Sequence, residues 1–343
     1  MIRILRLDKY SALYLWALFM IYFGLTKRDT FFSGATVKLV IQENIIIGVL
    51  AVAFLIPLAA GTYDLSIGAM MSFALVISAS FAQNGAMPNV AGMFVALIIC
   101  AVAGAASGFF VVKLKVNSFI ATLGMSQVLS ALILLTSSQS ITGVFTDSFT
   151  NLGAGTFLGL AHYVWYFLVL AVIVWFVLEH TPTGRYMYAA GGNPEAARLA
   201  GVKTDRLVWG SLIVSAVIAG FAGVIYSWKV GSYDESVGPG YLFPAVAAVF
   251  FGASQLKGRA NLWGTVIALY SLAWGVQGLE LTFITSSSWI SPLFQGISLL
   301  IAVALASHRG IVRVRRRSTK PNTPAPPAAV ASDDAQEHRE QTV

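Results

Sequence analysis

Residues that could do chemistry are few in this chain and lie far apart. Its histidines share no motif with one another or with paired carboxylates: His162, His180, His308 and His338. An enzyme site needs its nucleophile, base or metal ligands gathered at one place. The single cysteine, Cys100, lies in an apolar run, which excludes an internal disulfide and a cysteine metal cluster. We therefore expect no catalytic residue, no metal site and no cofactor in this chain.

A phosphate-binding loop is also missing from the sequence. The stretch GVKT at 201–204 lacks the glycine spacing of the G-x-x-x-x-G-K-[ST] motif, whose backbone amides cradle phosphates. We therefore do not expect this chain to hydrolyse ATP.

The most unusual polar stretch is GGNPEAARLAGVKTDR, which interrupts long apolar runs. Asn193 suits the N-cap of a helix, and Pro194 suits its first position. Glu195 then lies in the first turn, where the helix dipole favours an acid. Gly201 can end the helix in a left-handed conformation. The pattern predicts a helix of about seven residues, which would be marginal alone in water and must pack against its own domain or a partner.

Two readings of this short helix remain open from the residues alone. Ala196 and Ala197 offer small side chains that permit another protein to approach closely. Alternatively, the stretch is a surface loop in which Glu195 and Arg198 form only an i,i+3 pair, worth a few tenths of a kcal/mol.

The elements that must carry these residues are membrane helices. Hydrophobic residues make up 57% of the chain and charged residues 11%, against about 25% charged in an average soluble domain. The bilayer is therefore the expected solvent, and we predict an all-α polytopic bundle over residues 1–308 with a disordered cytoplasmic tail at 309–343. About ten segments are long and apolar enough to span: 10–26, 44–60, 67–83, 89–112, 118–136, 161–179, 206–229, 241–255, 260–279 and 288–306.

The distribution of positive charge favours ten spans with both termini in the cytoplasm. All but four of the 22 Lys and Arg residues then lie inside, the exceptions being Lys27, Arg28, Lys38 and Lys229. Such an excess is what the positive-inside rule requires. It also accounts for the net charge of +7 without nucleic acid as a partner.

Four stretches give the chain a resemblance to a known family. NPEAARLAG resembles the coupling-helix motif of permease subunits in ATP-binding-cassette importers. GTYDLSIGAMMSFA (61–74), VNSFIATLGM (116–125) and GPGYLFPAVAAVFFGASQLKGRANLWGT (238–265) resemble segments of the ribose/xylose/galactose-type permeases, in the expected order. The chain departs from the family pattern at Met125, at Leu242 and Phe243, and at 257–259.

The resemblance implies a transport subunit in a bacterial cell (inner) membrane, working by alternating access on a sugar. A separate cytoplasmic ATPase would hold ATP and Mg²⁺ and dock on a coupling helix at about 193–201. The residues implied in that docking are Asn193, Pro194, Glu195, Ala196, Ala197, Arg198 and Gly201. A second permease copy or a paralogue would complete the pathway. Polyols, autoinducer-like sugars and nucleosides are alternative solutes.

A substrate-loaded periplasmic or extracellular binding protein would dock on the outer loops. The candidate loops are 137–160 and 230–240, and their acids Asp147, Asp234 and Glu235 can steer a basic partner.

Polar residues near the segment ends are candidates for a gate or substrate pathway. Asp64 either shapes a gate or, the favoured reading, N-caps the third segment with Gly61 and Gly68 permitting the turn. Asn117 can likewise cap the fifth segment, and Thr122 can bond its own backbone, or both contact substrate. The complete pathway set is Asn44, Asp64, Ser66, Asn117, Phe119, Thr122 and Phe243.

An ion-coupled secondary transporter is the main rival function. Such a carrier usually places several ionisable groups within its spans. Apart from Asp64, Glu43 and Glu280 near predicted span ends, this chain has almost none.

Overall fold

The computed structural model describes residues 7–137, 139–233, 237–253, 259–283 and 289–308. The expected tail, 309–343, lies outside these residues. Helices dominate the described chain, so the all-α prediction is confirmed: α1 (Leu7–Thr26), α2 (Arg28–Phe31), α3 (Gly34–Glu43), α4 (Ile45–Ala59), α5 (Ile67–Gln83), α6 (Asn89–Val112), α7 (Ser118–Thr136), α8 (Asp147–Ala154), α9 (His162–His180), α10 (Pro182–Gly192), α11 (Pro194–Leu199), α12 (Thr204–Val230), α13 (Val237–Ala253), α14 (Leu262–Thr282) and α15 (Ile290–His308).

The strands of the described chain are two residues long and form two antiparallel pairs. β1 (Ile141–Thr142) pairs with β4 (Ser232–Tyr233), and β2 (Thr156–Phe157) pairs with β3 (Leu160–Ala161). These strand pairs hold loop segments together and form no sheet core.

Among the described residues, six helical stretches are long and apolar enough to cross a membrane by length and composition: Gly34–Ala59, Asn89–Val112, Ser118–Thr136, His162–His180, Thr204–Val230 and Leu262–Thr282. Four shorter apolar helices accompany them: Ala12–Thr26, Ile67–Gln83, Val237–Ala253 and Ile290–Ile301. The predicted range 44–60 is too short, because α3 and α4 make one stretch interrupted at Asn44.

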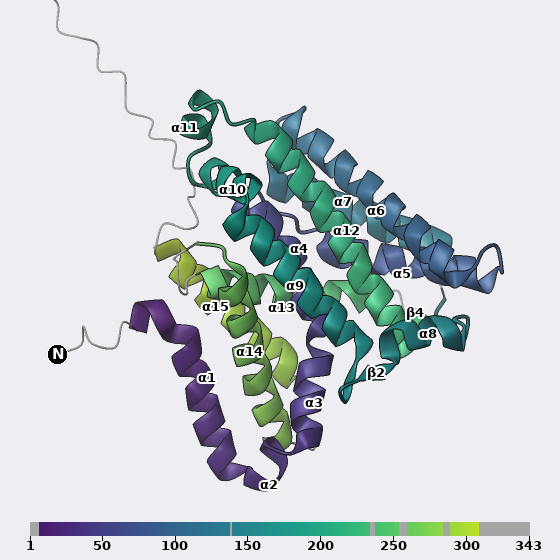
Figure 1. Ribbon diagram of the computed structural model, residues 1–343, viewed down its shortest axis with the longest axis vertical. Helices are drawn as coiled ribbons and strands as arrows, with labels where there is room; N and C mark the ends of the chain where they lie inside the picture. The colour runs from purple at the N-terminus through teal and green to yellow at the C-terminus, as the bar shows by residue number, and fades with distance from the viewer. Residues whose placement is uncertain (1–6, 138, 234–236, 254–258, 284–288, 309–343) are drawn as a thin grey trace, which may run out of the picture. The chain divides into compact units, whose positions relative to one another are not determined.

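The centre of the bundle is built on α4, α5 and α12, which pack against one another (Figure 1). Nearly every residue of α4 is buried, as expected for a helix that is apolar on all sides. The peripheral helices α6, α7 and α9 instead expose large apolar side chains such as Ile98, Leu135 and Val169. Apolar surface this extensive fits lipid rather than water.

Close approach of α5 and α13 requires glycine at their crossing. A Cβ added at Gly68 would lie 2.7 Å from the carbonyl oxygen of Gly238. The Gly238 N–H donates to the Ser72 hydroxyl at 2.9 Å. The expectation that Gly68 permits a turn is therefore wrong, because Gly68 lies inside α5 and serves packing.

Candidate coupling and substrate sites

The short polar helix forms where the sequence predicts it, as α11. The Asn193 side chain accepts a hydrogen bond from the Ala196 N–H at 3.2 Å, and Pro194 occupies the first helical position. Gly201 follows with φ +83°, the left-handed conformation that favours glycine. These local signals settle both ends of a six-residue helix.

One side of α11 is held by the protein and the other is open. Ala197 is buried, whereas Leu199 is 92% exposed. Arg198 lies 3.8 Å from Asp205 in the first turn of α12, and Asp205 lies 3.3 Å from Lys115. These exposed ion pairs orient α11 and add little stability. An apolar side chain this exposed on a capped helix suits contact with another protein.

The helix before α11 touches the turn between α4 and α5. Gly61 has φ +81°, and a Cβ added there would lie 2.8 Å from the Cα of Gly191 in α10. A Cβ added at Gly191 would in turn lie 2.5 Å from the Ala59 carbonyl oxygen. Because these backbones are in contact, a displacement of α10 would directly displace the end of α4.

The same turn is tied to the start of α7. The Tyr63 N–H donates to the Ser118 hydroxyl at 3.2 Å, and the Leu65 N–H donates to the Thr122 hydroxyl at 3.1 Å. Thr122 also donates to the Ser118 carbonyl at 2.8 Å, as the sequence suggested. Asn117 caps α7 by accepting from the Phe119 N–H at 2.9 Å, so that capping prediction is confirmed.

Asp64 is buried in this turn and accepts hydrogen bonds from the N–H and the hydroxyl of Ser66. The expectation that Asp64 N-caps α5 is wrong in detail, because Ser66 occupies the N-cap position and Asp64 fixes Ser66. Burial raises the pKa of Asp64 above its ordinary 3.8, and the Ser66 hydrogen bonds partly offset that rise.

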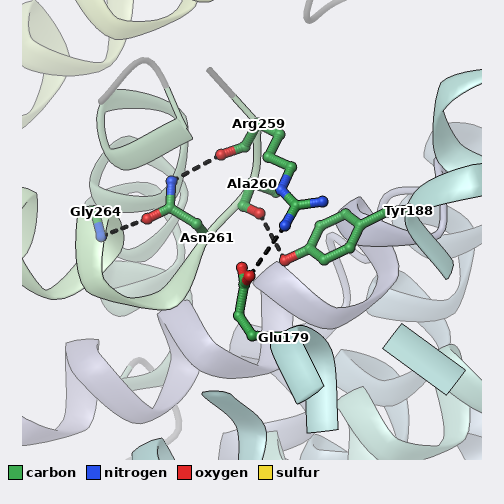
Figure 2. Close-up of polar contacts among 6 residues, drawn as sticks. All are labelled: Glu179, Tyr188, Arg259, Ala260, Asn261 and Gly264. Atoms are coloured by element: carbon green, nitrogen blue, oxygen red, sulfur yellow. Dashed lines mark hydrogen bonds and ion pairs between the residues drawn. The ribbon is translucent and has the colours of Figure 1, made fainter. Parts of the chain in front are cut away.

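A polar node joins α9 and α10 to the segment that leads into α14 (Figure 2). Arg259 forms an ion pair with Glu179 at 3.0 Å, and its guanidinium carbon lies 3.9 Å from the centroid of the Tyr188 ring. The Tyr188 hydroxyl donates to the Ala260 carbonyl at 2.9 Å. Burial first, and the Glu179 carboxylate second, raise the pKa of Tyr188 to about 12, with Arg259 opposing. Tyr188 therefore remains a hydrogen-bond donor at neutral pH.

The loops expected to meet a binding protein lie together near the opposite end of α12 from α11 (Figure 1). The β1–β4 pairing joins the 137–160 loop to the 230–240 loop. Asp147 lies in the exposed first turn of α8. Asp234 and Glu235 lie outside the described residues.

A cavity of about 420 Å³ opens between α3, α13, α14 and α15, and we call it the polar cavity. Its polar lining is Glu43, Asn44, Tyr241, Gln277, Glu280, Ser291 and Gln295. Of the pathway residues expected from sequence, only Asn44 lines it. Asp64, Ser66, Asn117 and Thr122 gather instead around the α4–α5 turn, and Phe119 and Phe243 lie on the exposed surface.

Sequence reasoning missed most of the polar cavity. Glu43 and Glu280 were noticed as rare acids near span ends, which was a usable signal. Gln277 and Gln295 carried no signal, because a lone glutamine in an apolar helix has many structural uses. Their approach depends on how α14 and α15 pack.

These features define the class: a multi-pass helical membrane protein that belongs to a transport system. The chain belongs to the family described as the permease component of the branched-chain amino acid transport system, whose match covers residues 38–303.

Similar proteins of known name are sugar permeases. The chain is 29% identical over 285 residues to the ribose import permease protein RbsC of Haemophilus influenzae, covering 82% of this chain and 87% of that protein. It is 32% identical over 281 residues to RbsC of Bacillus subtilis, covering 81% and 86%. It is 30% identical over 295 residues to the fructose import permease protein FrcC of Rhizobium meliloti, covering 83% and 81%. No solved structure matches the chain.

Proposed function

We propose that this chain is the membrane-spanning permease subunit of an ATP-driven, binding-protein-dependent importer of a monosaccharide. Family membership over residues 38–303 supports transport, and the similar ribose and fructose permeases support a sugar. Solute crosses by alternating access as the helices rock about the pathway.

In this proposal ten helical stretches cross the membrane, namely the six long ones and the four shorter apolar ones. Both termini then lie in the cytoplasm, together with α10, α11 and the Arg259 node. The α8 and β1–β4 region faces outward and receives the binding protein. Helix tilt and local thinning of the bilayer accommodate shorter spans.

The single observation that carries the proposal is α11, a capped helix with an exposed Leu199, in a chain of this family. A separate ATPase binds ATP and Mg²⁺. It docks on residues 193–201 of this chain, which comprise α11 and its two ends. Closure of the ATPase moves α10, and the Gly61–Gly191 contact passes that movement to α4. A second copy or a related permease completes the pathway.

Reconstitution tests this function directly. The chain is placed in liposomes with its ATPase and binding protein, and uptake of labelled ribose, fructose, arabinose and allose is measured, with a polyol and a nucleoside as further arms. We expect uptake of at least one sugar that requires ATP and all three components.

Two acids in the polar cavity, Glu43 and Glu280, give the ion-coupled carrier its one supporting observation. In the same liposomes, uptake driven by a proton or sodium gradient without ATP would favour that carrier and overturn the importer.

A further inference from the structure

We propose that the polar cavity is a selectivity site that binds neutral, hydroxyl-rich solutes and rejects anionic ones. The inference rests on the proposed function for its sugar, and it assigns the solute contacts to residues of α3, α13, α14 and α15 and to Asn44 between α3 and α4. Glu280 is its specificity-determining residue.

The lining is rich in hydrogen-bond acceptors. The Asn44 amide N–H donates inside the protein to the Val40 carbonyl at 2.8 Å, and the Gln295 amide donates to the Ser291 hydroxyl at 2.7 Å. The oxygen of each amide is an acceptor, and both residues line the cavity. When it is ionised, the Glu280 carboxylate has no donor and acts only as an acceptor. A ligand that suits such a lining is one that offers many donors, as a sugar does through its hydroxyl groups.

The cavity also has the size and the apolar surfaces that a sugar ring requires. Its volume of about 420 Å³ falls within the range of about 300–1,000 Å³ typical of small-molecule sites. Tyr241 and Phe294 are among the lining residues, and aromatic side chains suit contact with the C–H faces of a sugar. A few polar groups among apolar walls are the usual composition of such sites.

Charge in the cavity favours neutral over anionic solutes. Glu43 forms an ion pair with Lys229 at the end of α12. Within the described part of the chain, no Lys or Arg pairs with Glu280. Its uncompensated negative charge repels phosphates and carboxylates, because like charges brought together disfavour binding.

Cysteine labelling tests the charge of the cavity without relying on transport. The native chain has one cysteine, Cys100, which is buried, so Gln277→Cys adds the accessible thiol. In membranes we measure the rates at which cationic and anionic methanethiosulfonate reagents label the thiol. Each rate is divided by the rate of the same reagent at Leu199→Cys. We expect the cationic reagent to react on the order of tenfold faster at Gln277→Cys, and Glu280→Gln to abolish that preference. Ile98→Cys, on the exposed apolar face of α6, is the unreactive control.

Solute protection completes the test. Ribose, fructose, arabinose and allose are compared with ribonate and ribose 5-phosphate for their ability to slow labelling of Gln277→Cys. We expect a neutral sugar to protect and both anions to fail. Equal protection by anions, protection by no sugar, or a thiol as unreactive as Ile98→Cys would overturn the proposal. Sugar protection without ATP-driven uptake by the wild-type complex would instead overturn the proposed function and leave the cavity assignment standing.

Discussion

Gly61 and Gly191 meet backbone to backbone, although 129 positions separate 61 from 191 in the chain. The contact joins the turn after α4 to α10, the helix that leads into α11. Neither residue has room for a Cβ, and Gly61 also has a left-handed φ of +81°. The contact is one direct connection between the helix that precedes α11 and the buried α4.

Replacing Gly191 with alanine should separate α10 from the α4–α5 turn. The added Cβ would lie 2.5 Å from the Ala59 carbonyl oxygen, and overpacking of this kind costs about 1–3 kcal/mol. Gly192→Ala is the matched control, since nothing lies within 4 Å of its Cβ and alanine favours helix by up to about 1 kcal/mol. The temperature of thermal unfolding and the rate of ATP-driven uptake should both fall for Gly191→Ala and not for Gly192→Ala. Equal behaviour of the two variants would contradict the contact.

The Arg259 node should be sensitive to the shape of the cation as well as its charge. Arg259→Lys keeps the charge but loses the planar guanidinium over Tyr188. Because the ion pair with Glu179 is partly exposed, we expect the free energy of unfolding to fall by about 1–2 kcal/mol, a value between those of surface and buried ion pairs. Thermal unfolding measures this change. Tyr188→Phe keeps the ring under Arg259, removes the hydroxyl that donates to Ala260, and should cost about 1 kcal/mol. An Arg259→Lys protein as stable as wild type would refute the role of the stacking.

Changes in α11 should break ATPase docking while leaving membrane insertion intact. Deleting 193–200 or introducing Glu195→Lys is expected to abolish co-purification of the ATPase and ATP-driven uptake. Asn193→Ala removes the N-cap and should cost about 1 kcal/mol of helix stability, whereas Asn193→Ser keeps it. Uptake should therefore fall for the alanine variant and persist for serine. A deletion variant that still binds the ATPase normally would exclude α11 as the docking helix.

Asp64→Asn should be tolerated and should flatten one part of the pH dependence of stability. Burial raises the pKa of Asp64 in the folded state, so the folded protein binds this proton more tightly than the unfolded chain does. The stability that protonated Asp64 contributes is therefore fully present below about pH 3.8, and it is lost as the pH rises through the raised pKa of the folded state. Asparagine keeps an acceptor for Ser66 and carries no charge. The stability of the Asp64→Asn protein, measured by unfolding at a series of pH values, should therefore fall less with rising pH than that of the wild type.

Asp64→Ala is the control for that experiment, because it removes the acceptor and should destabilise the α4–α5 turn by about 1–3 kcal/mol. If Asn and Ala prove equally damaging to transport, the charge itself is required and Asp64 acts as a gate.

The sequence by itself determined the helical class, the positions of most long helices and several of their caps. Long apolar runs predict helices because a bilayer leaves no other partner for backbone polar groups. Asn117, Asn193 and Gly201 cap their helices as expected, since capping depends on residues within one turn. Family motifs also lay within single stretches and could be read in order.

Only the tertiary structure decided which helices meet. The pairing of Glu179 with Arg259, the Gly61–Gly191 contact and the cavity that Glu43 and Gln277 both line all join segments distant in the chain. Helices such as α4 are apolar on every side, so no stripe in their sequence marks the face that packs. Their partners are set by how small residues let backbones approach, which is a property of the assembled bundle.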